Sequence, residues 1–156
     1  MSEPLRVLFV CTGNTCRSPM AEAMFRSAAE EKLAVEVSSA GVAAGPGGSA
    51  SRETMEVLED RGIELNGFRS AMVDEEMLKA AAHVFCMTRS HREMLEMMYP
   101  EFRDNFHLVR DFDEGGTGQD VPDPIGQGRG AYEDVARCFD RALAGILEYV
   151  SAEKGE

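Results

Sequence analysis

The chain has 156 residues, of which 44% are hydrophobic and 28% are charged. This length and composition predict one globular domain, residues 1–156, and exclude a disordered or fibrous protein. The formal net charge of -12 argues against nucleic-acid binding, because phosphate backbones are held mainly by lysine and arginine side chains.

No apolar stretch approaches the length that spans a bilayer, and the sequence does not begin with a basic segment followed by an apolar run. Four cysteines in a chain of this length suit reduced thiols better than a disulfide framework. These observations predict a cytoplasmic protein without a membrane partner.

Four strands are predicted from short apolar and β-branched runs. The first, RVLFVC, ends in a turn that contains glycine, and the last is the weakest. The strands are expected over residues 6–11, 35–41, 83–87 and 106–109.

Helical patterns separate the strands and follow the last one. The first helix is expected to have Ser18 as its N-cap and Pro19 at its first helical position. The other helices are expected over residues 52–61 after the N-cap Ser51, over 74–82, from the N-cap Thr88 to Pro100, and over about 132–152. The predicted apolar faces contain Met20, Met24, Phe25 and Ala28 in the first helix, Met55, Val57 and Leu58 in the second, Met94, Leu95 and Met98 in the fourth, and Val135, Phe139, Leu143, Ile146 and Val150 in the last.

The alternation of strands and helices predicts a three-layer, doubly wound α/β fold, in which helices cover both faces of a parallel sheet. In such folds ligands bind at the carboxyl ends of the strands. The segment CTGNTCRS, residues 11–18, lies there, between the first strand and the first helix.

This segment has the form Cys-x5-Arg-Ser. A loop of this kind at a helix N-terminus can turn its backbone N–H groups inward and bind an anion, and the same field favours the thiolate form of Cys11. Arg17 adds a planar guanidinium that can hold two oxygens of a phosphoryl group. The segment therefore predicts a nucleophile within an anion-binding loop.

Other residues of the segment suit this interpretation. Gly13 and Asn14 tolerate the positive φ that a tight loop requires, and Ser18 can donate its hydroxyl to the Cys11 sulfur. Each residue alone also fits a plain structural role, such as a small core cysteine or a surface arginine. It is their combination and order that favour catalysis.

A zinc site is not expected, because the three histidines at positions 83, 91 and 107 form no zinc-binding spacing with the cysteines. No other cofactor is predicted either. Transfer of a phosphoryl group to a thiolate requires a proton donor for the leaving group and later a base for water. Asp123, between two prolines in DVPDP, is the candidate, although a plain turn explains this stretch equally well from spacing alone.

The stretches VCTGNTCRSPMAE, SAGV and DVPDP resemble the low-molecular-weight protein phosphatase family over nearly the whole chain. The resemblance implies a four-stranded parallel sheet and a metal-free, two-step mechanism with a phosphocysteine intermediate. It implies that Cys11 attacks phosphorus, that Arg17 and the loop amides stabilise the transition state, and that Asp123 acts as general acid and then as general base. The phosphate-binding loop would consist of Thr12, Gly13, Asn14, Thr15, Cys16 and Ser18. The expected partners are phosphorylated proteins, and the product is inorganic phosphate.

The substrate prediction depends mainly on Thr15. Tyrosine phosphatases of the family commonly have isoleucine there, whereas threonine resembles the branch that acts on protein phosphoarginine. Ile125 and Gly126 follow the DP pair where eukaryotic tyrosine phosphatases of the family have aromatic residues, so stacking on a phosphotyrosine ring would be poor. We therefore expect phosphoarginine, with phosphotyrosine as the alternative. The chain departs from the family at Gly67, where members often have histidine, and at Ile125, where arginine phosphatases tend to have an aromatic residue.

Cys16 is predicted to form a disulfide with Cys11 on oxidation, as a reversible off-switch, although it also fits simple packing. Cys86 and Cys138 are expected in the core. An arsenate reductase would need two further cysteines close together, which the sequence lacks. An alternative from a different functional class is an inactive anion-binding or redox-sensing module that uses the same loop.

Overall fold

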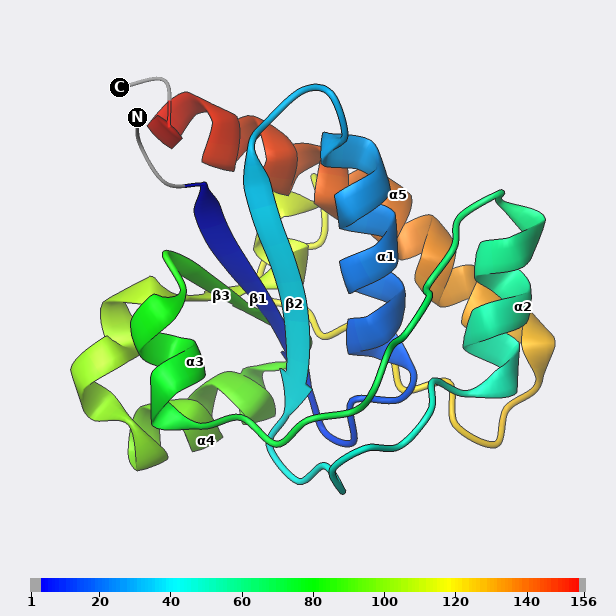
Figure 1. Cartoon of the computed structure of the whole chain (residues 1–156), viewed down its shortest axis with the longest axis horizontal. Coiled ribbons are helices and arrows are strands. Elements are labelled where there is room, and N and C mark those ends of the chain that lie inside the picture. Colours follow the sequence, from blue (N-terminus) through cyan, green and yellow to red (C-terminus); the bar gives the residue numbers. More distant parts are fainter. Residues whose placement is uncertain (1–3, 155–156) are drawn as a thin grey trace.

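The computed structural model describes residues 4–154, so the ends of the predicted domain, 1–3 and 155–156, lie outside the described residues. Its sheet has four strands in the order β2-β1-β3-β4, and every neighbouring pair is parallel. The strands are β1 (Leu5–Cys11), β2 (Val35–Gly41), β3 (His83–Cys86) and β4 (Phe106–Leu108) (Figure 1). The predicted parallel sheet is confirmed.

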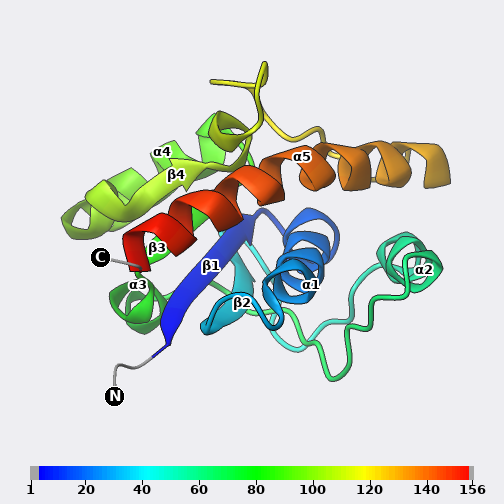
Figure 2. The ribbon, with the colours of Figure 1, turned by 90° about the horizontal axis from the view of Figure 1, so that it is seen from above.

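The helices occupy the segments between and after the strands. They are α1 (Arg17–Ala29), α2 (Arg52–Asp60), α3 (Glu75–Ala80), α4 (Arg89–Met98) and α5 (Arg129–Lys154), with two short 3-10 helices, η1 (Pro100–Asn105) and η2 (Val109–Phe112). Figures 1 and 2 show α1 and α5 side by side, and α2 beyond them at the edge of the molecule.

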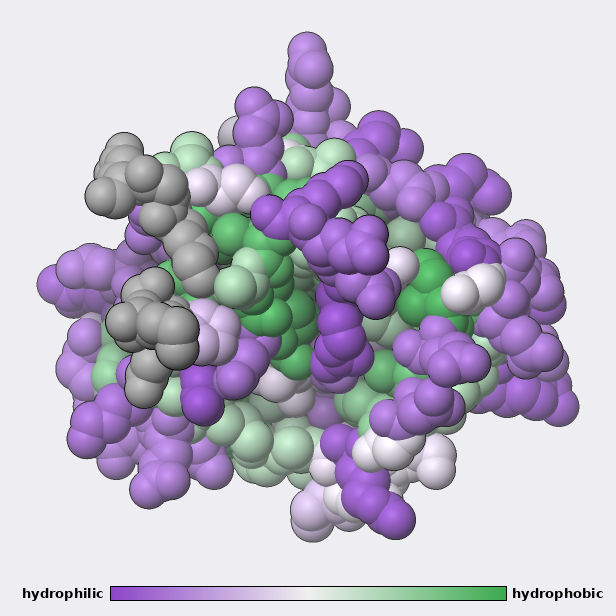
Figure 3. Space-filling view, turned by 45° about the horizontal axis from the view of Figure 1, so that its top comes forward, coloured by the Kyte–Doolittle hydropathy of each residue, from purple (hydrophilic) through white to green (hydrophobic). Residues whose placement is uncertain are grey.

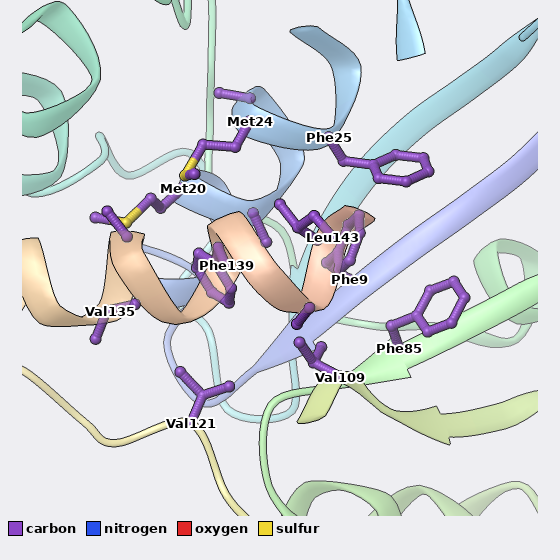
Figure 4. Packing of buried hydrophobic residues seen from close by; sticks show 14 of the residues in the cluster. Phe9, Met20, Met24, Phe25, Phe85, Val109, Val121, Val135, Phe139 and Leu143 are labelled. Atoms are coloured by element: carbon purple, nitrogen blue, oxygen red, sulfur yellow. The ribbon is translucent and has the colours of Figure 1, made fainter. Parts of the chain in front are cut away.

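Two hydrophobic clusters lie on opposite faces of the sheet. Because side chains alternate along a strand, Val7 and Phe9 of β1 enter one cluster and Leu8 and Val10 enter the other. The first cluster is covered by α1 and α5, whose side chains meet over β1 (Figure 4). The second includes Leu95 of α4 and residues of α3. This arrangement confirms the three-layer α/β fold.

The structure corrects the start of the first helix. Cys16 occupies the N-cap position without a side-chain cap, and Ser18 is a helical residue. The Ser18 hydroxyl contacts the sulfur of Cys11 instead of capping the helix. Pro19 still fits in the first turn, because backbone N–H groups there have no helical acceptor.

Three methionines predicted on apolar helix faces are exposed, namely Met55 (39%), Met94 (41%) and Met98 (45%). The buried part of α4 is narrower than its apolar pattern and consists of His91 and Leu95. The remaining predicted apolar-face residues are buried or half-buried: Met20, Met24, Phe25, Ala28, Val57, Leu58, Leu95, Val135, Phe139, Leu143, Ile146 and Val150.

The last helix begins earlier than its apolar repeat indicates. α5 starts at Arg129, where the expectation was about residue 132. The Arg129 guanidinium pairs with Glu56 and Asp60 of α2 and with Glu133 of its own helix. These contacts stabilise a first turn that contains Gly130. Most other element boundaries agree with the prediction to within two residues, but the two 3-10 helices were not predicted.

Figure 3 shows hydrophilic residues over much of one face, with patches of hydrophobic residues between them. Within residues 4–154, no helix is both long enough and apolar enough to cross a membrane.

Candidate active site

The loop between β1 and α1 lies at the carboxyl end of the sheet (Figure 1). It borders a pocket of about 160 Å³. A larger hollow of about 520 Å³ lies beside the end of α1, but no cysteine or histidine is among the described residues that line it. The smaller pocket is lined by Cys11, Thr12, Gly13, Thr15, Cys16, Arg17, Asp123 and Ile125. It therefore brings together most of the site residues that the sequence predicted.

Asn14 and Ser18 lie behind this pocket and are fully buried. The Ser18 Oγ is 2.8 Å from the Cys11 Sγ, and the Asn14 amide donates to the same Ser18 oxygen over 2.7 Å. Because this oxygen already accepts a hydrogen bond from Asn14, the Ser18 proton is available to the sulfur. A donor in this position stabilises a thiolate.

A chain of polar contacts continues from Asn14 to the surface. Its amide also donates to the Ser39 Oγ over 2.9 Å, and Ser39 donates to the carboxylate of Glu22 over 2.6 Å. Glu22 is 8% exposed and pairs with Arg26 over 2.6 Å. The Asn14 carbonyl oxygen accepts the backbone N–H of Ala71 over 2.9 Å. These contacts join the loop to α1, to β2 and to the segment before α3.

The backbone of the loop is tightly constrained at Asn14, whose φ is 55°. This left-handed conformation suits asparagine, as the sequence predicted, whereas Gly13, for which the same was expected, does not have a positive φ. Gly41, at the end of β2, passes close behind the loop, and a Cβ there would collide with the carbonyl oxygen of Thr12. Among the described residues, the backbone N–H groups of 13–16 have no hydrogen-bond acceptor. They are available for an anion.

Arg17 is 6% exposed and lines the pocket. Its Nη1 donates to the carbonyl oxygen of Val121 over 2.9 Å. Val121 is fully buried in the core, and its backbone N–H donates to the carbonyl oxygen of Met87 over 2.8 Å (Figure 4). The segment that leads to Asp123 is thus anchored to the end of β3 and to Arg17.

Asp123 lies between Pro122 and Pro124 in this segment, and its Oδ1 accepts the backbone N–H of Ile125 over 3.1 Å. Asp123 lines the same pocket as Cys11. Ile125 is 62% exposed at the rim of the pocket. The structure therefore brings the predicted acid and the predicted nucleophile to one site.

α2 supports the other side of the loop. The backbone N–H of Ser51, its N-cap, donates to the carbonyl oxygen of Thr15 over 2.8 Å. The hydroxyl of Thr54 donates to the carbonyl oxygen of Cys16 over 3.2 Å. The sulfur of Cys16 is 3.3 Å from the hydroxyl of Tyr132. Burial, together with this contact, raises the pKa of Tyr132 to about 12, so its hydroxyl keeps its proton at neutral pH.

Comparison with known proteins shows the family. Residues 6–156 match the family model of low molecular weight phosphotyrosine protein phosphatases. The chain belongs to this family.

Similar proteins carry two kinds of name. A protein-arginine-phosphatase of Bacillus subtilis is 42% identical over 149 residues, which cover 95% of this chain and 98% of that protein. A low molecular weight protein-tyrosine-phosphatase of the same species is 33% identical over 156 residues, covering 96% and 98%. These comparisons confirm the predicted class of enzyme: the chain is a phosphatase, and so a hydrolase.

A solved structure supports the family's chemistry. An arginine phosphatase with cysteine replaced by serine, and with a phosphorylated active-site serine, superimposes with a TM-score of 0.88. It is 37% identical and covers 94% of this chain and 95% of its own. A phosphoryl group on that side chain is consistent with the phosphocysteine intermediate predicted for the family.

Sequence reasoning did not predict several residues that contact the loop of this phosphatase or, in the case of Glu22, reach it through Ser39: Glu22, Ser39, Ser51, Thr54, His91, Val121 and Tyr132. Most reach the loop only through tertiary contacts. Glu22 had a detectable signal, because it follows Ser18 by one helical turn and so lies on the same face of α1.

The other two cysteines of the phosphatase are buried, as predicted. Burial raises the pKa of Cys86 to about 12 and also raises the pKa of Cys138. Both are therefore inert thiols at neutral pH. Among residues 4–154, no group of three or more histidine, cysteine, aspartate or glutamate side chains has the geometry of a metal site.

Proposed function

We propose that the chain is a metal-independent protein phosphatase that acts through a phosphocysteine intermediate. The observation that supports this most strongly is that Cys11, Arg17 and Asp123 border one small pocket. A thiol nucleophile, a permanent cation and a carboxyl group form a set that can carry out phosphoryl transfer. The free N–H groups of 13–16 add an oxyanion site.

In the first step, the Cys11 thiolate attacks phosphorus and forms the S–P bond while the bond to the leaving group breaks. Asp123 gives its proton to the leaving atom. The guanidinium of Arg17 and the loop N–H groups stabilise the charge on the transferring oxygens. The Ser18 hydroxyl, 2.8 Å from the sulfur, can donate a hydrogen bond to it before attack.

In the second step, the Asp123 carboxylate accepts a proton from water as the water oxygen attacks phosphorus. The S–P bond breaks, inorganic phosphate leaves, and the Cys11 thiolate and protonated Asp123 are restored. No metal is required, because the positive charge at the pocket comes from Arg17 and from N–H dipoles.

Turnover of a generic aryl phosphate tests this mechanism. Cys11→Ser is expected to abolish turnover, whereas Cys138→Ala, in a buried thiol away from the pocket, is expected to keep it. Full turnover by Cys11→Ser would defeat the mechanism, and no thiol-dependent turnover by the unaltered protein would favour an inactive anion-binding or redox module.

The role of Asp123 is tested by the leaving group. Asp123→Ala is expected to slow poor leaving groups most, because these need the proton from the acid. Asp104→Ala, at an exposed position in η1, is the matched control. Unchanged rates in Asp123→Ala would mean that another group donates the proton.

We further propose phosphoarginine in proteins as the substrate. Thr15 offers a small, hydroxyl-bearing wall that suits a planar guanidinium, and the exposed Ile125 followed by Gly126 offers no ring for phosphotyrosine. The higher identity to the arginine phosphatase than to the tyrosine phosphatase agrees with this choice.

Paired peptides that differ only in the phosphorylated residue test the substrate. The unaltered protein is expected to have a higher kcat/KM for phosphoarginine, and Thr15→Ile is expected to narrow or reverse the ratio. Thr15→Val keeps the size of threonine and removes its hydroxyl, so it separates the two contributions. A preference of the unaltered protein for phosphotyrosine would overturn the assignment.

Oxidation is proposed to switch the enzyme off. Peroxide would convert the Cys11 thiolate to a sulfenic acid, and attack by the Cys16 sulfur would form the disulfide and release water. Both thiols line the same pocket, which supports this pairing. After peroxide treatment, mass spectrometry should find a Cys11–Cys16 linkage, and in Cys16→Ser it should find over-oxidised Cys11. A treated sample of the unaltered protein that lacks the linkage would refute the switch.

A cytoplasmic location and phosphorylated proteins as partners complete the proposal. The four unpaired cysteines support a reducing compartment.

A further inference from the structure

A histidine outside the predicted site contacts the pocket wall. The Nε2 of His91 is 2.7 Å from the Oγ1 of Thr12, which lines the pocket. His91 is 5% exposed and lies in the first turn of α4, where its backbone N–H donates to the N-cap Thr88. Because β1 and β3 are neighbours, the segments that follow them bring these two side chains together.

The imidazole of His91 is neutral near pH 7. Burial lowers its pKa to about 4, and the positive charge of Arg17 acts in the same direction. The carboxylates of Asp120 and Asp123 oppose this shift but are weaker. A neutral imidazole carries one proton, so only one of its nitrogens can donate.

The surroundings of the ring decide which nitrogen carries the proton. The Nδ1 is buried and has no hydrogen-bond partner among the described residues. A buried N–H without an acceptor is rarer in proteins than a buried acceptor without a donor. The proton therefore belongs on Nε2, which donates to the Thr12 Oγ1. The hydroxyl proton of Thr12 is then free to point elsewhere.

We propose that His91 is a positioning residue that directs the hydroxyl proton of Thr12 into the pocket, where it donates to an oxygen of the bound phosphoryl group. The inference rests on the proposed function, because it assumes a phosphoryl group in this pocket. It adds a side-chain donor to the backbone N–H groups of 13–16 and to Arg17. A hydrogen bond to a charged oxygen is stronger than one between neutral groups.

Binding of inorganic phosphate at pH 7, measured by calorimetry and by competitive inhibition, tests the proposal. Thr12→Val removes the hydroxyl donor and is expected to weaken phosphate binding by about tenfold. His91→Leu removes the side chain that orients this hydroxyl and is also expected to weaken phosphate binding. Thr12→Ser and His91→Gln keep a hydroxyl and a side-chain donor, so both are expected to stay within about twofold of the unaltered protein.

The double variant distinguishes positioning from a structural role. Once Thr12→Val has removed the hydroxyl, adding His91→Leu is expected to change phosphate binding by less than about twofold, because paired residues are not additive. Two effects that multiply would overturn the proposal. Phosphate binding by Thr12→Val that is as tight as in the unaltered protein would also overturn it. Thr12 is exposed, so this result remains informative even if His91→Leu fails to fold.

The two proposals fail in different ways. An unaltered protein that binds no phosphate would overturn both the proposed function and this inference. An unaltered protein that binds phosphate, with a Thr12→Val variant of equal affinity, would leave the phosphatase intact and overturn only the role of His91.

Discussion

The guanidinium of Arg17 donates a 2.9 Å hydrogen bond to the carbonyl oxygen of Val121, two residues before Asp123. The group that would bind phosphate therefore also fixes the segment that carries the acid. The loop that would bind phosphate and the segment that carries Asp123 therefore both depend on the Arg17 side chain.

Arg17→Lys is expected to lower kcat for an aryl phosphate by about 10²–10³-fold, because lysine offers a point charge in place of a planar fork. The loss of the Val121 contact should also speed hydrogen exchange at the Val121 amide. Arg6→Lys, at an exposed ion pair of β1, is the control and should change neither quantity. A normal kcat in Arg17→Lys would contradict this reading of the site.

Asn14→Gly is expected to lower the free energy of unfolding by about 2–3 kcal/mol, because it leaves the Ala71 N–H without its acceptor and removes the amide donor from the oxygens of Ser18 and Ser39. Asn14→Ala should lower it by about 1 kcal/mol more, since φ is 55° there. Urea denaturation measures both. The exposed Asn66→Gly is the matched control, with an expected change below about 0.5 kcal/mol. Equal stability of the Asn14 and Asn66 variants would show that the polar contacts of Asn14 contribute nothing to the free energy of unfolding.

Gly41→Ala is expected to destabilise the fold by about 1–3 kcal/mol and to reduce phosphatase activity, because the new methyl group displaces the loop at Thr12. Gly45→Ala is the matched control, since a Cβ there meets nothing within 4 Å. Thermal unfolding and turnover of an aryl phosphate are measured on both. If the two variants behave alike, the close approach at Gly41 does not shape the loop.

The lowered pKa of His91 predicts a pH-dependent stability. As pH falls from 6.5 towards about 4, the unfolded chain takes up a proton on this residue and the folded chain does not, so stability is lost in this window. Above pH 6.5 the imidazole is neutral in both states and its contribution is constant. His91→Gln should flatten this part of the profile of unfolding free energy against pH.

The pKa of His107 is also lowered, by burial and by the nearby His83. His107→Gln should therefore also reduce the loss of unfolding free energy as the pH falls, independently of His91. An unchanged slope in His91→Gln, against a flatter one in His107→Gln, would mean that His91 binds its proton equally in both states.

Local sequence signals predicted much of the fold and part of the candidate site. Short apolar and β-branched runs predicted the strands, and the spacing of Cys11 and Arg17 at a strand-to-helix turn predicted the loop. The flanking prolines made Asp123 a candidate, but it was the family resemblance that favoured it over a plain turn. The tertiary partners were not recognisable, since Ser39 and His91 reach the loop from positions distant in sequence.

The N-caps Ser51 and Thr88 were predicted correctly, and the clearest errors concern the cap of α1 and the apolar face of α4. Ser18 has the residue type of an N-cap, but its hydroxyl interacts with a sulfur that only the folded loop brings near. Met94 and Met98 follow a helical apolar period, yet α4 buries only His91 and Leu95. Residue type and period do not report how wide a face the neighbouring layer covers.

The contacts from α2 have a consequence for how the pocket can change. Ser51 and Thr54 hold the carbonyl oxygens of Thr15 and Cys16, so the main chain is fixed there without any help from the Thr15 side chain. The residue at position 15 can be exchanged while the anion-binding backbone keeps its shape. Under the role proposed for position 15, substrate choice and the reaction itself would be under separate control, and a single codon would alter one without the other.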